Sequence, residues 1–126
     1  MDNIVLKIPK KSEYMSTIRL TTSALSSLNG FDIDEISDIK VIISEICTFF
    51  IKSINDNTEY FEINYQIYQD KIVVSVSDLN NGDINEKSNL NVDMSIMIIE
   101  SLSDDYNYDL NNKTITFEKI KLNGRW

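Results

Sequence analysis

The spacing of hydrophobic residues changes along this chain, and that change limits the fold more than any other feature. Between residues 14 and 54 hydrophobic residues recur at helical intervals, which predicts two amphipathic helices over 14–28 and 33–54 with a turn at Asn29-Gly30. From Tyr60 to Gln69, and again over 72–76, hydrophobic and polar residues alternate, as they do in half-buried strands. The sequence therefore predicts two helices followed by a β-hairpin.

The rest of the chain completes a mixed fold. We expect a short strand stopped by Pro9, a polar loop, a densely apolar helix and a second hairpin, over residues 4–8, 78–91, 94–102, 107–110 and 114–120. This order predicts an α+β class: a two-layer α/β sandwich with helices on one face of a mostly antiparallel sheet. The length predicts a single domain over 1–126.

Composition limits the partners. The 126 residues carry a net charge of -8 without a run of Lys and Arg, which argues against direct binding to nucleic acid or to an anionic membrane. No histidine is present, so metal ligation or base catalysis by histidine is excluded. The single cysteine, Cys47, fits a reducing compartment. Because no signal peptide or membrane-spanning run is visible either, we expect a cytoplasmic protein.

Several short segments, in a fixed order, resemble one known family. They are Leu6-Lys7-Ile8-Pro9, Ile18-Arg19-Leu20-Thr21, Asp38-Ile39-Lys40, Ser44-Glu45-Ile46-Cys47-Thr48, Ile99-Glu100-Ser101-Leu102-Ser103-Asp104 and Leu122-Asn123-Gly124. In their order and spacing the chain resembles the anti-sigma-factor serine kinases of the sigma-B and sigma-F type, members of the GHKL (Bergerat-fold) ATPases. The resemblance implies a histidine-kinase-like ATPase fold, a homodimer paired through the N-terminal strand, and ATP with magnesium as cofactor.

The resemblance assigns roles to the first part of an ATP site, and two positions depart from it. Glu45 matches the general base toward a substrate serine. Phe49 stands where the family has the asparagine that ligates magnesium, and a phenyl ring offers no oxygen ligand. Asp78 matches the residue that contacts the adenine amino group. Asn80 stands where a glycine should follow, unless Gly82 takes that role.

The phosphate-binding part departs further. By the resemblance, Asp93 and Ser95 occupy the positions of two glycines whose backbone amides approach the phosphates at a helix N-terminus. We expect Asp93 to cap that helix itself. The segment 80–91 is also shorter than the family's ATP lid. These departures predict lost or impaired ATP binding, no metal site, and a cofactor implied by resemblance only.

A polar face on the first helix is the predicted partner surface. Arg19 is its centre, with Met15, Ser16 and Thr22 as neighbours. In the family an arginine at this place contacts both the sigma factor and the anti-anti-sigma protein. Arginine suits this contact because its planar fork binds a carboxylate through two parallel hydrogen bonds.

Three functional hypotheses follow. The favoured one is an anti-sigma-like regulator of stress-response transcription that binds a sigma factor, an anti-anti-sigma protein or both, without ATP turnover. The alternative is an active ATP-dependent serine/threonine kinase that phosphorylates an anti-anti-sigma factor, with Asn55 or Asn80 replacing the missing metal ligand. The third is a regulatory or structural dimer with no sigma partner.

Overall fold

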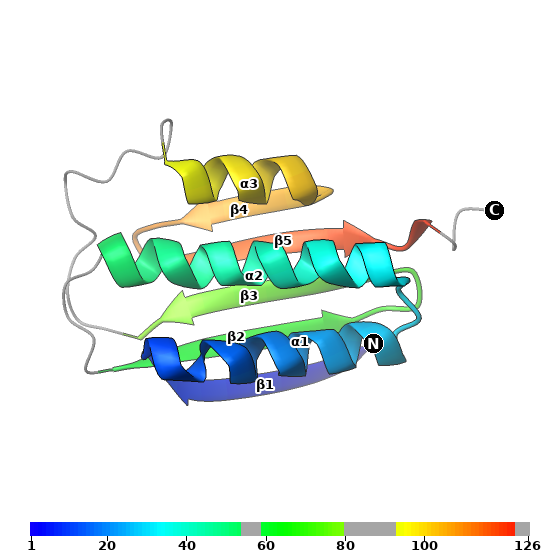
Figure 1. Cartoon of the computed structure of the whole chain (residues 1–126), viewed down its shortest axis with the longest axis horizontal. Helices are drawn as coiled ribbons and strands as arrows, with labels where there is room; N and C mark the ends of the chain where they lie inside the picture. The colour runs from blue at the N-terminus through cyan, green and yellow to red at the C-terminus, as the bar shows by residue number, and fades with distance from the viewer. Residues whose placement is uncertain (54–58, 80–92, 123–126) are drawn as a thin grey trace.

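The computed structural model describes residues 1–53, 59–79 and 93–122, and all the helices and strands below belong to this part of the chain (Figure 1). In chain order they are β1 (Asp2–Pro9), the 3-10 helix η1 (Ser12–Tyr14), α1 (Met15–Leu28), α2 (Ile33–Ser53), β2 (Tyr60–Ile67), β3 (Lys71–Asp78), α3 (Met94–Leu102), β4 (Asp105–Asp109) and β5 (Thr114–Ile120). The helix predicted over 94–102 has these same bounds in the structure, whereas the strand predicted from residue 107 already begins at Asp105.

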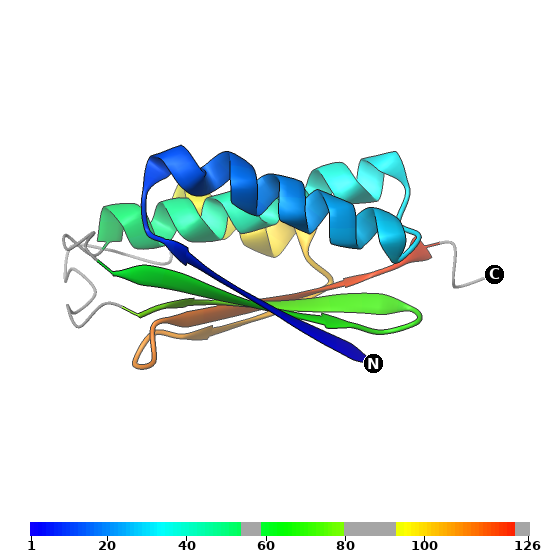
Figure 2. The same ribbon diagram turned by 90° about the horizontal axis from the view of Figure 1, so that it is seen from below.

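The described strands form one antiparallel sheet in the order β1-β2-β3-β5-β4. Figure 2 shows that α1, α2 and α3 cover one face of this sheet and leave the other face open. This arrangement confirms the predicted α+β fold. β1 and β4 are the edge strands, and β1 runs antiparallel to β2 along its whole length.

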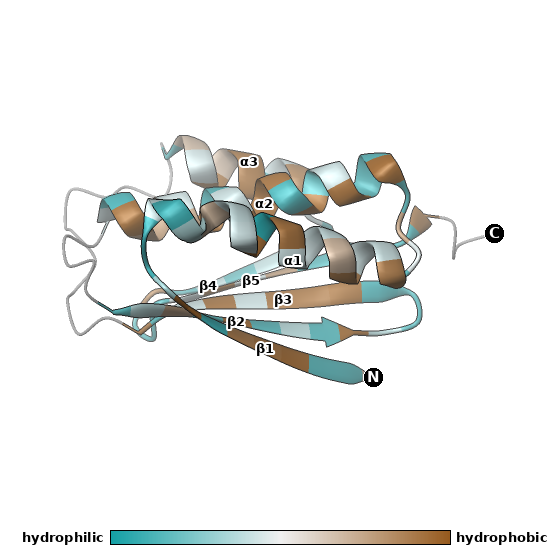
Figure 3. Cartoon of the chain, turned by 60° about the horizontal axis from the view of Figure 1, so that its bottom comes forward, coloured by the Kyte–Doolittle hydropathy of each residue, from teal (hydrophilic) through white to brown (hydrophobic). Residues whose placement is uncertain are grey.

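The core lies between the helices and the covered face of the sheet. Its strand residues alternate in sequence: Phe61, Ile63, Tyr65, Ile72, Val74, Val76, Ile115 and Phe117 are all buried. The residues between them lie on the open face and are mostly polar, with Val73 as an exception; Ser75 and Thr116 share a hydrogen bond of 2.8 Å there. Figure 3 shows the mixed hydropathy of α1 and α2 that lets each helix bury one side. None of the helices in the described ranges is long and apolar enough to cross a membrane.

Helix α1 buries a more polar face than its hydrophobic residues predict. The inward residues are Met15, Ile18, Thr22 and Ser26, while Leu28 is 85% exposed. The hydroxyl groups of Thr22 and Ser26 can be buried because both are hydrogen-bonded. Thr22 donates to the carbonyl of Ile18 and lies 2.7 Å from the hydroxyl of Tyr65 on β2, and Ser26 donates to the carbonyl of Thr22.

Reciprocal hydrogen bonds define the start of α2. Gly30 ends the preceding turn with a φ of +87°, a conformation that glycine adopts without steric penalty. The Asp32 carboxylate accepts the amide of Glu35, and the Glu35 carboxylate accepts the amide of Asp32, which is a capping box. Asp32 therefore caps the N-terminus of α2.

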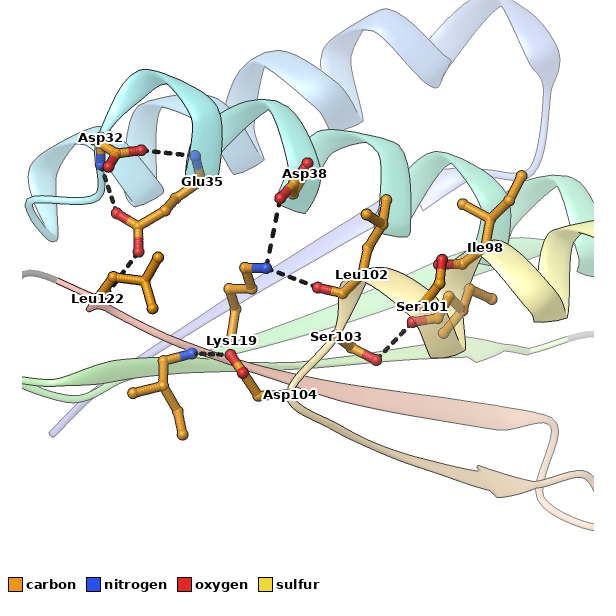
Figure 4. Close-up of polar contacts among 12 residues, drawn as sticks. Asp32, Glu35, Asp38, Ile98, Ser101, Leu102, Ser103, Asp104, Lys119 and Leu122 are labelled. Carbon is orange, nitrogen blue, oxygen red and sulfur yellow. Dashed lines mark hydrogen bonds and ion pairs between the residues drawn. The ribbon is translucent and has the colours of Figure 1, made fainter.

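The end of β5 is tied to the helices by further polar contacts (Figure 4). The second oxygen of Glu35 accepts the amide of Leu122 at 2.9 Å. The ammonium of Lys119 donates to the carbonyl of Leu102 at 2.7 Å and lies 3.6 Å from the carboxylate of Asp38. The helical layer and the central part of the sheet are thereby held together at the end of the molecule opposite to Asp78.

Candidate functional site

Glu45 and Phe49 lie four residues apart on α2 but in different surroundings. Glu45 is half-buried and lines a surface groove of about 270 Å³ between α1 and α2, together with Arg19, Ser37, Lys40, Val41 and Ser44. Phe49 is fully buried, and its ring meets that of Phe50 edge to face, with 5.7 Å between the ring centroids. The groove therefore joins Glu45 to Arg19, whereas Phe49 belongs to the core.

Asp78, at the end of β3, forms a buried ion pair with Lys10. The ammonium of Lys10 lies 2.6 Å from a carboxylate oxygen of Asp78, and both side chains are 0% exposed. The same ammonium stands 6.0 Å from the centre of the Phe61 ring. Two opposite charges buried at this distance satisfy each other electrostatically. The Asp78 carboxylate is therefore paired with a cation from the same chain, the Lys10 ammonium.

Two buried titratable groups, Cys47 and Tyr65, have raised pKa values. Burial raises the pKa of the Cys47 thiol to about 12; the Asp78 carboxylate also raises it, and the Arg19 guanidinium opposes the rise. Burial likewise raises the pKa of Tyr65 to about 12, against the lowering effect of its hydrogen bond with Thr22. Cys47 is thus a protonated, fully buried thiol, and such thiols are inert.

The N-terminus of α3 is capped by Asp93. One carboxylate oxygen accepts the backbone amide of Ser95 at 2.9 Å and that of Ile96 at 3.4 Å. The other oxygen lies 3.1 Å from the ammonium of Lys52 on α2. The expected cap is confirmed, and the positive end of the helix dipole faces a negative charge supplied by the chain.

The structure corrects part of the predicted partner surface. Ser16 is exposed and Arg19 is half-buried, but Met15 and Thr22 lie in the core. Both are placed there by helical periodicity, because Met15, Ile18 and Thr22 fall on one side of α1 and that side packs on the sheet. Lys40 and Val41 of α2 line the groove beside Arg19 instead.

Other predicted site residues lie outside the described part of the chain. These are Asn80, Asn55 and Gly82, together with the proposed short lid over 80–91. Among the residues that the structure does describe, no three acidic or cysteine side chains are grouped closely enough to hold a metal ion.

Two site residues were missed by sequence reasoning, Lys10 and Lys52. Each pairs with an aspartate far away in the chain, and no spacing within one segment indicates such a pair. For Lys10 the signal exists only in the sheet register, in which Ile8 is opposite Phe61 and Phe61 is opposite Asp78.

Residues 8–119 match the family model of the histidine kinase-like ATPase domain. The serine-protein kinase RsbW of Bacillus licheniformis is 33% identical over 90 residues, which cover 68% of this chain and 56% of the relative. That of Listeria innocua is 42% identical over 79 residues, covering 61% of this chain and 50% of the relative. The chain thus spans about half the length of the curated relatives it matches.

A solved structure shares the fold. The crystal structure of the RsbU and RsbW domains of Rv1364c from Mycobacterium tuberculosis superposes with a TM-score of 0.70 and 14% sequence identity. The superposition covers 96% of this chain and 32% of that chain. At this identity the likeness concerns the arrangement of helices and strands alone.

Proposed function

The chain belongs to the histidine kinase-like ATPase domain family, and from this premise we propose that it is an anti-sigma-like binding protein that has lost ATP turnover. It captures a sigma factor, an anti-anti-sigma protein or both in the cytoplasm, through the groove between α1 and α2. Members of this family typically bind ATP and magnesium. The proposal therefore depends on whether the residues at the matching positions fit that pair.

The observation that carries the proposal is the occupied N-terminus of α3. A phosphate group would bind the free backbone amides and the positive dipole end at this terminus. The Asp93 carboxylate already accepts hydrogen bonds from amides there and faces the dipole. A phosphate would have to displace this carboxylate from the amides and from Lys52. If the carboxylate stayed, a negative charge at about 4 Å would cost the phosphate about 1–4 kcal/mol at high to intermediate dielectric.

The other two family positions agree with this view. Phe49 is buried against Phe50 and has no oxygen to offer magnesium, which requires near-octahedral oxygen ligands. The Asp78 carboxylate is engaged by Lys10. The residues present therefore do not fit Mg-ATP.

The groove between α1 and α2 fits a protein partner better than a nucleotide. Arg19 and Lys40 bring two cations to the groove, against the one carboxylate of Glu45, so in a chain of net charge -8 this groove is locally suited to a further carboxylate. Val41, which lines the groove, is 39% exposed, and Leu20, next to Arg19 in the sequence, is 68% exposed. Arginine is enriched among interface hot spots, and the exposed aliphatic side chains near Arg19 offer apolar surface that a protein partner would cover.

The first prediction concerns nucleotide. Millimolar Mg-ATP or Mg-ADP is expected to leave the melting temperature unchanged. A ligand present at 100 times its Kd would add about 2.7 kcal/mol and raise the melting temperature by several degrees. Differential scanning fluorimetry measures this, with an RsbW kinase as positive control. A clear upward shift would instead support the alternative function, an ATP-dependent serine/threonine kinase with Glu45 as its base, which is favoured by the access of Glu45 to the groove.

The second prediction concerns the partner. Arg19→Glu is expected to weaken binding to the cognate sigma factor at least tenfold, since a hot-spot arginine is worth about 2 kcal/mol or more. Each alternative sigma factor of the source organism is assayed with the purified chain by biolayer interferometry. Lys11→Glu, which makes the same charge change at an exposed residue that does not line this groove, is the matched control. Equal affinities for the two variants would refute the role of Arg19.

We also propose that the protein is a homodimer paired through β1. This strand is at an edge of the sheet, so one of its sides has no strand partner among the described residues. Val5 on this strand is 53% exposed. Pairing of two copies would cover an edge that otherwise invites uncontrolled strand addition.

A further inference from the structure

We propose that the ammonium of Lys10 is a built-in ligand of the Asp78 carboxylate, and that it excludes free ligands bearing an amino group from this position. The inference deepens the proposed function and rests on it, because it names the residue that keeps one part of the ancestral site closed. The ligand class is a primary amine or an amino-purine base. Either can offer a carboxylate the N–H donors that Lys10 now offers.

The sheet register brings Lys10 to Asp78. Ile8, Phe61 and Asp78 lie side by side on three neighbouring strands, β1, β2 and β3. The amide of Lys10 donates to the carbonyl of Glu59, so the β1–β2 pairing continues for one more contact beyond Pro9. Lys10 is two residues beyond Ile8 and therefore has the same facing, toward the helices. Its long side chain can then extend toward the far strand, past Phe61.

The burial of Lys10 makes it an effective competitor. Lysine is almost never fully buried unless it is paired, and here its side chain is 0% exposed with Asp78 2.6 Å away. Because Lys10 and Asp78 belong to one folded chain, their contact is intramolecular. The effective concentration of the Lys10 ammonium at Asp78 is on the order of millimolar or higher, and a free amine would have to exceed this concentration to compete. Ordinary concentrations of amine or nucleoside therefore leave the pair intact.

Shortening Lys10 would expose the carboxylate to such ligands. Lys10→Ala removes three methylene groups and the ammonium, leaving a hollow beside Asp78 and the Phe61 ring. n-Propylammonium has the shape and charge of the removed atoms. Adenosine offers an aromatic plane for Phe61 and an exocyclic amino group for the carboxylate, whereas inosine carries a carbonyl at that place.

The experiment is a thermal-shift titration of Lys10→Ala with n-propylammonium chloride, adenosine and inosine. We expect propylammonium at tens of millimolar to raise the melting temperature of Lys10→Ala by several degrees over equimolar sodium chloride, and to leave the wild type and Lys11→Ala unchanged. Adenosine with a larger effect than inosine would extend the site to amino-purines. Absence of any stabilisation by propylammonium in a folded Lys10→Ala, or equal stabilisation of Lys11→Ala, would overturn the inference.

A second measurement does not require the variant to fold. The wild-type chain is treated with a limiting amount of acetylating reagent, and each lysine is followed by mass spectrometry. Lys10 is expected to react at least a hundredfold more slowly than exposed Lys11 next to it. Equal rates would overturn the inference. Neither measurement uses ATP or a protein partner, so stabilisation of the wild type by Mg-ATP would contradict the proposed function through a separate readout.

Discussion

Asp78→Leu is expected to lower the free energy of unfolding by roughly 3–5 kcal/mol, because it leaves the Lys10 ammonium in the interior without the opposite charge. Removing one partner of a buried ion pair costs stability, because the remaining ion is desolvated and no longer has an opposite charge nearby. Urea denaturation followed by circular dichroism measures the loss. A loss below about 1 kcal/mol would mean that the pair is solvated in the native protein.

Two comparison variants make this result specific to the pair. Replacing both ions, as Lys10→Met with Asp78→Leu, is expected to restore most of the stability, because hydrophobic residues of similar volume often replace a buried ion pair at no net cost. Glu118→Gln breaks the Lys71–Glu118 pair, which lies at 2.5 Å with side chains 34% and 20% exposed. Such a solvated pair is expected to contribute far less to stability than the buried pair of Lys10 and Asp78.

The periodic parts of this fold were predictable from the sequence. Alternation along Tyr60–Ile67 and Lys71–Asp78 requires one buried and one open sheet face, and the structure has both. The dense apolar run of α3 directly indicated a buried helix, and Gly30 directly indicated the end of α1. In each case the signal is local, since the residues that produce it are neighbours on one element.

The prediction failed where polar residues enter the interior. Its polarity predicts a surface position for Thr22, but the hydroxyl of Tyr65 provides the partner that permits its burial. Lys10 also has a distant partner. Asp78 is reached from Lys10 only across two strand pairings, so the sequence alone does not indicate the contact. A single sequence shows where polar groups are, but it does not show which distant group satisfies them.

Phe49→Asn is expected to cause the second large effect, a loss of roughly 3–5 kcal/mol in the free energy of unfolding, without any gain in Mg-ATP binding. The variant restores the residue type that the family resemblance places at this position. It also removes a fully buried aromatic ring and its edge-to-face contact with Phe50, and it places an amide in an apolar environment. Urea denaturation measures the stability, and Mg-ATP titration by fluorimetry measures binding.

The absence of restored binding follows from where the other obstacles lie. Phe49→Asn leaves the Asp93 carboxylate on the amides of Ser95 and Ile96, and leaves Lys10 on Asp78. Phe49→Leu is the matched control, because it reduces the side-chain volume without adding a polar group and should destabilise the chain less. If Phe49→Asn alone were stabilised by Mg-ATP while Phe49→Leu was not, the missing magnesium ligand would be the sole barrier. Phosphate would then displace the Asp93 carboxylate from the N-terminus of α3. In that case Asp93 would not be the residue that prevents phosphate binding there.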